Sequence, residues 1–221
     1  MQRILINCEG QTEQEFCQSL LKPYFQNINI FIETPIIKRS GGGIVGWEIL
    51  KNQVEIQLKK EKNIYVTTFI DFFKLSTSYY RSEVKNTQNI TDKYGTVQRI
   101  EEGMKNDIQE KLRERFIPYV QLHEFEALLF YSIEIFERWI PKNEFVDKDE
   151  ILRTFNTYSN PELINDNKPP SKILQGSIQG YNKVLYGSVL ALEIGLSNIR
   201  SKNPRFSRWI ETLEKLPPLQ K

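Results

Sequence analysis

The chain has 221 residues, of which 39% are hydrophobic and 26% are charged, as is usual for a globular protein. Thirty basic and 28 acidic residues nearly cancel, so the overall charge does not argue for nucleic-acid binding, which would need a local basic patch. No signal-peptide pattern and no apolar run of about 18 residues occurs, so we expect a cytoplasmic protein without a membrane span.

Strand and helix patterns alternate along the first half of the sequence. Short runs rich in β-branched and aromatic residues predict strands, and longer amphipathic segments predict helices. The predicted strands are 3–7, 27–37, 63–71 and 115–122, and the predicted helices lie within 12–25, 40–62 and 97–114. Strands that alternate with helices of this length indicate βαβ units and a mostly parallel, four-stranded sheet.

The first two of these helices carry recognisable signals. Thr12 is a candidate N-cap, and lysines gather at the end of the second helix, as the helix macrodipole favours. Phe16, Leu20 and Leu21 lie at helical spacing in the first helix, and the second helix carries the apolar residues Ile49, Val54, Ile56 and Leu58.

The second half of the sequence is dominated by helix patterns. The predicted helices are 133–140, 149–156, 181–195 and 205–216, and a proline-rich segment at 160–172 links the middle two. The fold class we expect is therefore α/β, with an α/β core at 1–130 and a helical C-terminal region at 131–221 packed on it. The polar, aperiodic segment 74–95 is either a plain surface loop or a functional flap.

Acidic side chains and the single histidine follow three of the predicted strands. Glu9 follows the first strand, Asp71 ends the third, and the sequence HEFE at 123–126 follows the fourth. In open parallel sheets, ligands bind outside the carboxyl ends of the strands. A set of carboxylates without a cysteine cluster suits a hard cation such as Mg²⁺ or Mn²⁺, so we expect a metal site at this edge.

Each of these residues also has a structural interpretation. Glu9 could serve the turn before a helix, and Asp71 could be an N-cap. A lone histidine such as His123 is more often hydrogen-bonded than metal-bound. If a helix starts at about Leu122, His123 and Glu126 share one face and Glu124 points elsewhere, which nominates Glu126 as the ligand.

Two segments are candidates for phosphate contact. The glycine-rich sequence SGGGIVGW at 40–47, with Gly42 and Gly43, lacks the pattern of a P-loop, so a tight turn before a helix is the first interpretation. Lys168 and Lys172 in the proline-rich segment could hold a phosphate or be solvated. The mixtures YYR at 79–81 and RFSRW at 205–209 could stack bases, although core aromatics explain Phe206 and Trp209 equally well.

Several motifs, in order along the chain, resemble the DUF4276 family. They are CEGQTEQEF, GGGIVGWEIL, YVTTFIDFF, RFIPYVQLHEFEALLF, PELINDNKPPSKIL and YNKVLYG, and the resemblance runs from residue 3 to about residue 215. Members of this family are regarded as TOPRIM-like. The resemblance implies a TOPRIM-type fold, in which a glutamate after the first strand and an Asp-x-Asp after a later strand bind Mg²⁺.

The match to the TOPRIM pattern is incomplete. Glu9 matches the glutamate and Asp71 the first aspartate, but Phe73 stands at the position of the second aspartate and cannot bind metal. Glu126 or Glu124 would then replace the missing carboxylate. TOPRIM proteins include topoisomerases, primases and nucleases, and relatives of this kind are often encoded beside an ATPase in antiphage defence systems.

The acidic residues and the family resemblance together lead us to expect a Mg²⁺-dependent or Mn²⁺-dependent nuclease acting on DNA or RNA. The resemblance implies an ATPase partner, and a homodimer is a further expectation. Glu9, Asp71 and Glu126 would bind the metal, His123 and Glu124 would assist, and Lys172 would position a phosphate. One alternative is a catalytically silent TOPRIM-like module that binds nucleic acid or the ATPase. Another is phosphoryl or nucleotidyl transfer to a small molecule.

Overall fold

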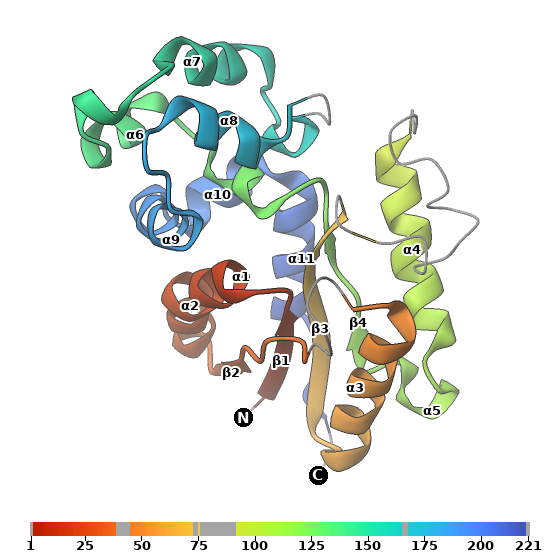
Figure 1. The fold of residues 1–221 in the computed structure, drawn as a ribbon. Coiled ribbons are helices and arrows are strands. Elements are labelled where there is room, and N and C mark those ends of the chain that lie inside the picture. Colours follow the sequence, from red (N-terminus) through yellow and green to blue (C-terminus); the bar gives the residue numbers. More distant parts are fainter. Residues whose placement is uncertain (1, 39–44, 73–74, 76–91, 165–167, 220–221) are drawn as a thin grey trace.

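The computed structural model describes residues 2–38, 45–72, 75, 92–164 and 168–219 (Figure 1). Gly42, Gly43, Phe73, the YYR sequence and most of the predicted 74–95 loop lie outside these residues. No helix within the described ranges is long and apolar enough to cross a membrane.

Within the described residues, the strands form one parallel sheet. They are β1 (Gln2–Cys8), β2 (Ile30–Glu33), β3 (Ile64–Asp71), β4 (Phe116–Ile117) and β5 (Val120–Gln121). The order is β2-β1-β3-β4, and β5 also pairs with β3. All eight residues of β3 are buried, as expected for a central strand covered on both faces. The predicted α/β class with a mostly parallel sheet is confirmed.

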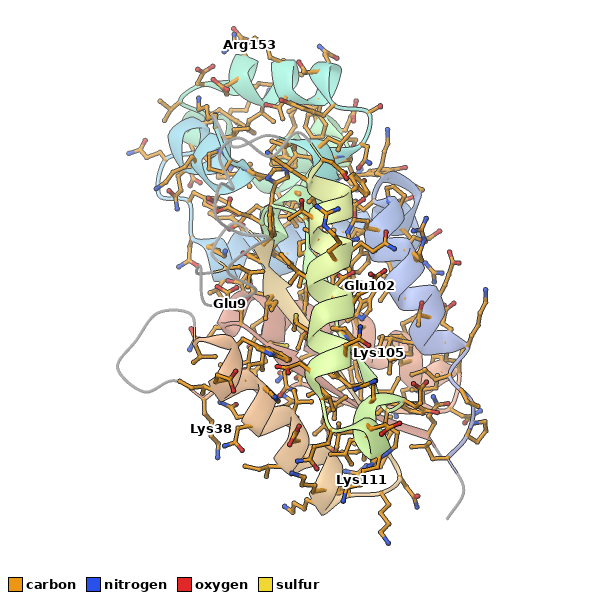
Figure 2. All side chains as sticks on the ribbon, turned by 90° about the vertical axis from the view of Figure 1, so that its right-hand side faces the viewer. Glu9, Lys38, Glu102, Lys105, Lys111 and Arg153 are labelled. Atoms are coloured by element: carbon orange, nitrogen blue, oxygen red, sulfur yellow. The ribbon has the colours of Figure 1, made fainter. Side chains whose placement is uncertain are left out.

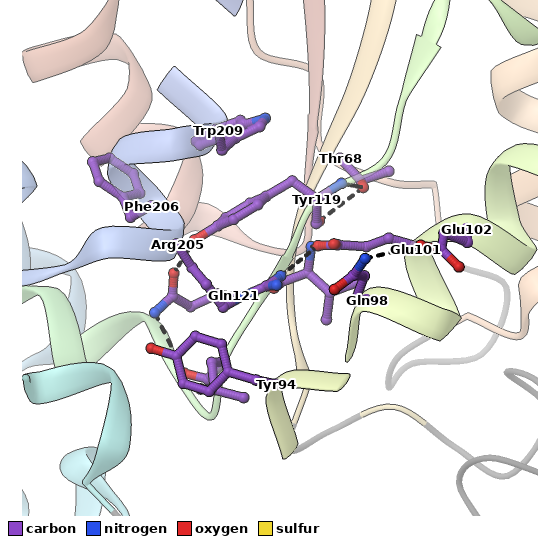
Figure 3. A network of polar contacts seen from close by, with 12 residues as sticks. Thr68, Tyr94, Gln98, Glu101, Glu102, Tyr119, Gln121, Arg205, Phe206 and Trp209 are labelled. Carbon is purple, nitrogen blue, oxygen red and sulfur yellow. Dashed lines mark hydrogen bonds and ion pairs between the residues drawn. The ribbon is translucent and has the colours of Figure 1, made fainter. Parts of the chain in front are cut away.

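The predicted fourth strand is divided into β4 and β5. Pro118 lies at the break, and proline has no N–H to donate to a neighbouring strand. The side chain of Thr68 bridges the gap, because its hydroxyl accepts the N–H of Tyr119 and also lies 2.9 Å from the carbonyl oxygen of Tyr119 (Figure 3). The edge of the sheet therefore continues through the break without regular strand pairing.

Most helices occur where the sequence predicts them, but the helices Pro170–Ser177 and Leu196–Lys202 lie outside the predicted segments. In the first half they are α1 (Gln11–Phe16), α2 (Lys22–Asn27), α3 (Trp47–Lys60), α4 (Lys93–Asp107) and α5 (Glu110–Arg113), with a π-helical turn at Cys17–Leu21 between α1 and α2. In the second half they are α6 (Ile133–Trp139), α7 (Lys148–Thr157), α8 (Pro170–Ser177), α9 (Lys183–Ile194), α10 (Leu196–Lys202) and α11 (Pro204–Glu214). Short 3-10 helices lie at η4 (Phe125–Leu129), η5 (Lys142–Glu144) and η6 (Pro161–Leu163).

One detail of the helix predictions is wrong, and a second feature, the buried face of α3, is defined only by the structure. Thr12 is not the N-cap of the first helix, because α1 begins two residues earlier than that cap implies, with Gly10 as its N-cap, and Thr12 is buried. Ile49 and Ile56 of α3 are exposed, because the buried stripe of this helix lies on the face that contains Trp47, Leu50, Val54, Glu55 and Leu58.

Two hydrophobic clusters cover the two faces of the sheet. On one face, α3 and α4 pack on alternate strand residues such as Leu5 and Val66. On the other face, one continuous cluster joins Ile4 and Ile6 of β1 to α1, α2 and the C-terminal helices, including Phe206 of α11. The C-terminal helices therefore pack on the sheet, while the boundary at residue 130 stays a prediction.

Helix α11 is fixed to the sheet by an aromatic cluster. The Trp209 ring stacks on Tyr119 with centroids 4.4 Å apart, and lies 5.4 Å from Phe69. Its indole N–H donates to the hydroxyl of Thr67 at 2.9 Å. Phe206 and Trp209 are both buried, so the core interpretation of RFSRW is confirmed and these rings are not available to stack on bases.

A polar network lies beside this aromatic cluster (Figure 3). Arg205 donates to Glu101 of α4 at 2.6 Å and to the carbonyl oxygen of Val120 at 3.1 Å. Glu162 of η6 accepts the backbone N–H groups of Arg205 and Phe206 at the start of α11. Burial raises the pKa values of Glu101 and Glu162, and the charge of Arg205 opposes this effect. Arg205, the first arginine of the RFSRW sequence, therefore stabilises the fold.

Asp107 links α3 to the end of α4 and gives a test by pH. It accepts the indole N–H of Trp47 at 2.6 Å and pairs with Lys51 at 3.2 Å. Burial tends to raise the pKa of Asp107, but the contacts with Trp47 and Lys51 lower it overall. A lowered pKa adds stability that is present above the usual aspartate pKa and is lost as the pH falls through the folded-state pKa.

We therefore expect Asp107→Asn to destabilise the protein by about 1 kcal/mol at neutral pH, a value reduced for solvent screening of this partly exposed carboxylate. The two melting temperatures should converge as the pH falls below about 4, because wild-type Asp107 is then protonated too. Thermal melts from pH 3 to pH 7 measure this. A difference that persists at pH 3 would show that the contact acts through shape and not charge.

Candidate functional site at the carboxyl edge of the sheet

Glu9 and Asp71 lie at the ends of neighbouring strands, as predicted. Cys8 of β1 pairs with Phe69 of β3, so Glu9 follows directly beyond β1 while Asp71 ends β3. The carboxylate of Glu9 accepts the backbone N–H of Asp71 at 3.0 Å, and the N–H of Glu9 donates to the carbonyl oxygen of Phe69. Both acidic side chains are buried. Figure 2 shows Glu9 at this edge, on the side of the C-terminal helices.

The segment after β5 does not form the predicted helix. His123 has a backbone φ of 66°, in the left-handed region, and the 3-10 helix η4 begins only at Phe125. His123 and Glu126 therefore do not share a helix face, and the argument that preferred Glu126 over Glu124 on that ground is wrong. Leu122, Phe125 and the rest of η4 are nevertheless buried, as the apolar pattern indicates.

Asp71 explains why the chain turns at His123. One carboxylate oxygen of Asp71 accepts the backbone N–H of Phe125 at 3.0 Å. The first residue of η4 is thereby fixed to the end of β3, and the left-handed residue before Glu124 allows the chain to reach that position. Asp71 thus fixes the first turn of η4, a segment distant in the sequence, and its interpretation as the N-cap of the residues that follow it stays a prediction.

The two glutamates of the HEFE sequence have different partners. Glu124 accepts the backbone N–H of Ser171 at 3.0 Å, at the beginning of α8, where a negative charge is favoured by the helix dipole. Glu126 is fully buried, and its Oε1 lies 2.9 Å from the ammonium group of Lys183. Glu124 therefore links the segment after β5 to α8, and Glu126 links it to α9.

The structure adds two residues that the sequence reasoning missed, Tyr181 and Lys183. Burial, with a smaller effect from the charges of Glu126 and Glu124, raises the pKa of Tyr181 well above the ordinary tyrosine value. Lys183 is the first residue of α9, after the N-cap Asn182. The sequence YNK before an apolar helix carried a signal, because a lysine at a helix N-terminus is unfavourable for the helix itself.

The lysines proposed to bind phosphate contact other groups. Lys172 is exposed on α8 and donates to the side chain of Gln175 at 3.1 Å. Lys168 pairs with Glu150 of α7 at 2.7 Å. Neither contact involves the carboxylates at the sheet edge, so the phosphate role of both lysines stays a prediction, as does that of Gly42 and Gly43.

The carboxylate side chains at this edge are of the type that binds a hard cation, but their positions in this structure do not form a metal site. Carboxylate oxygens are the preferred ligands of Mg²⁺ and Mn²⁺, and Glu126 has one buried oxygen without a hydrogen-bond partner among the described residues. However, within those residues no three histidine, cysteine, aspartate or glutamate side chains lie close enough together to hold a metal ion. The Glu9 carboxylate accepts the backbone N–H of Asp71, one oxygen of Asp71 accepts the N–H of Phe125, and Glu126 pairs with Lys183.

Comparison with known proteins identifies a family and gives little beyond it. The model of the family described as "Domain of unknown function (DUF4276)" matches residues 8–214. No curated protein matches the sequence. Among solved structures, the chain is similar to the "C-terminal region of the Burkholderia pseudomallei OLD protein", with 13% identity, a TM-score of 0.48 and coverage of 96% of this chain and 98% of that one. A likeness this weak does not establish a shared activity.

Proposed function

The chain belongs to the DUF4276 family, and from that premise we propose that it is a metal-dependent nuclease of TOPRIM-like type that acts on DNA or RNA. The observation that carries the proposal is the hydrogen bond from the backbone N–H of Asp71 to the carboxylate of Glu9, which brings the two residues together. These two buried carboxylates occupy the ends of adjacent parallel strands, where ligands of open α/β sheets bind. They also stand at the positions that the family resemblance matches to TOPRIM metal ligands.

Glu9, Asp71 and Glu126 are the residues that would hold Mg²⁺ or Mn²⁺. When bound, such an ion lowers the pKa of a coordinated water and neutralises charge on a phosphodiester. His123 is buried, in a backbone conformation of the kind often found at functional sites, two residues before Phe125, whose N–H donates to Asp71. Glu124, fixed to the beginning of α8, would position the segment that carries His123 and Glu126.

The partners form part of the same proposal. The family resemblance suggests an ATPase encoded nearby and a role in antiphage defence, and the cytoplasmic location expected from the sequence belongs to the same proposal. The nucleic acid would need a local basic surface, since the net charge is only +2. Homodimer formation stays a prediction.

A catalytically silent module that binds nucleic acid or the ATPase is the second candidate. The observation in its favour is that no three potential ligands are grouped among the described residues, and that Lys183 already neutralises Glu126. Phe73, in place of the second TOPRIM aspartate, points the same way.

A cleavage assay separates the two candidates. The purified protein, alone and with the ATPase encoded beside it, is incubated with single-stranded and double-stranded DNA and RNA in Mg²⁺, Mn²⁺ or EDTA. The nuclease proposal predicts cleavage that requires the metal. Binding of nucleic acid or of the ATPase without cleavage in any of these mixtures would favour the silent module.

A further inference from the structure

Glu126 is neutralised by a basic side chain from a different element. Its carboxylate is fully buried, and Lys183 is its ion-pair partner, with Nζ 2.9 Å from Oε1. The second oxygen, Oε2, has no hydrogen-bond partner among the described residues. A buried carboxylate that has lost its counter-ion is strongly destabilising, so some cation has to stand beside Glu126 whenever it is ionised.

The position of Lys183 is set by the beginning of α9. The side chain of Asn182 accepts the N–H groups of Val184 and Leu185 at 3.1 and 3.0 Å and so fixes the first turn. Lys183 is the first residue of that turn, where the positive end of the helix dipole disfavours a cation. Lys183 therefore destabilises the first turn of α9, and its ion pair with Glu126 offsets this effect.

Lys183 can leave this position more easily than Glu126 can. Its side chain is 28% exposed, whereas that of Glu126 is 0% exposed. A lysine has a flexible four-carbon stem and a strongly hydrated ammonium group, so rotation into solvent requires no change in the backbone. Beside the pair, the hydroxyl of Tyr181 is buried and has no hydrogen-bond partner within the described residues. The surroundings of Glu126 thus contain polar atoms that this structure leaves unused.

We propose that Lys183 is a placeholder cation, whose ammonium group neutralises Glu126 until a divalent metal ion takes its place. The inference rests on the proposed metal site and adds a regulating residue to it. It agrees with the finding that no three potential metal ligands are grouped among the described residues, because the ion pair holds Glu126 toward α9. Lys183 is then a positioning residue that competes with the metal for one carboxylate.

Mn²⁺ binding to the full chain tests this competition directly. We expect Lys183→Met and Lys183→Gln to bind Mn²⁺ about tenfold more tightly than the wild type, measured by electron paramagnetic resonance of free Mn²⁺, since a coupling of that size is usual between competing ligands. Mn²⁺ should also raise the melting temperature of both variants by more than that of the wild type, because it restores the missing counter-ion. Lys183→Gln retains a polar side chain and serves if Lys183→Met does not fold.

A double-mutant cycle with Glu126→Gln distinguishes competition from a general effect of charge. If Lys183 acts through Glu126, replacing the lysine in the Glu126→Gln background should not change the Mn²⁺ affinity. The matched control is Lys59→Met, because Lys59 also pairs with a mostly buried glutamate, Glu55, at 3.0 Å on α3. Its Mn²⁺ affinity should equal that of the wild type.

The outcomes separate this inference from the proposed function. If Mn²⁺ binds and Glu9→Gln weakens it, but the Lys183 variants bind as the wild type does, the placeholder is wrong and the metal site stands. The placeholder is equally wrong if Lys183→Gln still tightens binding in the Glu126→Gln background. If Mn²⁺ binds to no form of the protein, both the placeholder and the metal site are wrong.

Discussion

Asp71→Asn and Glu9→Gln should each lower metal-dependent cleavage by at least about a hundredfold, because a metal ligand supplies several kcal/mol of transition-state stabilisation. Both substitutions keep the size of the side chain and remove its charge. The Asn and Gln side chains also retain a carbonyl oxygen that can accept the N–H of Phe125 or of Asp71. The local fold should therefore survive. Initial rates of cleavage at saturating Mn²⁺, with melting temperatures measured alongside, give the comparison.

Glu162→Gln is the matched control for loss of a buried acid. Glu162 is also fully buried and accepts backbone N–H groups, but its partners are at the start of α11. We expect this variant to keep most of its cleavage activity at a temperature below its melting point. Equal losses in Glu162→Gln and Asp71→Asn would show that activity follows stability and not a metal ligand at Asp71.

Trp209→Ala should have the largest effect on stability, about 3–5 kcal/mol in the free energy of unfolding, since it removes a large buried aromatic side chain. Trp209 is 4% exposed, stacks on Tyr119 and donates to Thr67. Because the ring joins α11 to the central strand, its loss should lower the stability of the sheet as well as that of the C-terminal helices. Urea unfolding, followed by both circular dichroism and tryptophan fluorescence, measures the change.

Trp139→Ala is the control for the type of substitution. Trp139 ends α6 and is 46% exposed, so its removal should cost less than about 1 kcal/mol. If the two probes gave separate transitions for Trp209→Ala, with the sheet as stable as in the wild type, the C-terminal helices would be an independent unit. The single hydrophobic cluster that joins them to β1 argues for one transition.

The sheet and the pair of acids at its edge could be predicted from the sequence. The run of strand-forming residues in β3 is interrupted at Asp71 and that of β1 ends just before Glu9, so the two acids mark where the strands stop. Parallel pairing then places both ends at one edge. The conformation of the loops does not enter this inference, so the hydrophobic pattern was enough to predict that Glu9 and Asp71 lie at the same edge of the sheet.

The arrangement after β5 could not be predicted in the same way. The left-handed backbone at His123 and the late start of η4 depend on a hydrogen bond from Phe125 to Asp71, which lies 54 residues earlier in the chain. Local propensity contains no information about such a contact. The pairing of Glu126 with Lys183 depends equally on how α9 packs against η4. Lys168 was nominated from composition, and its pairing with Glu150 on α7 is again a tertiary contact.

Crystals soaked in Mn²⁺ test the central claim most directly. A metal site that uses Glu9 and Asp71 predicts an anomalous difference peak between these two carboxylates, together with a shift of Lys183 away from Glu126 if Glu126 joins the site. The peak should be absent in Asp71→Asn crystals soaked in the same way. If wild-type crystals show no anomalous peak near Glu9 and Asp71, at a Mn²⁺ concentration that supports cleavage, the proposed metal site is wrong.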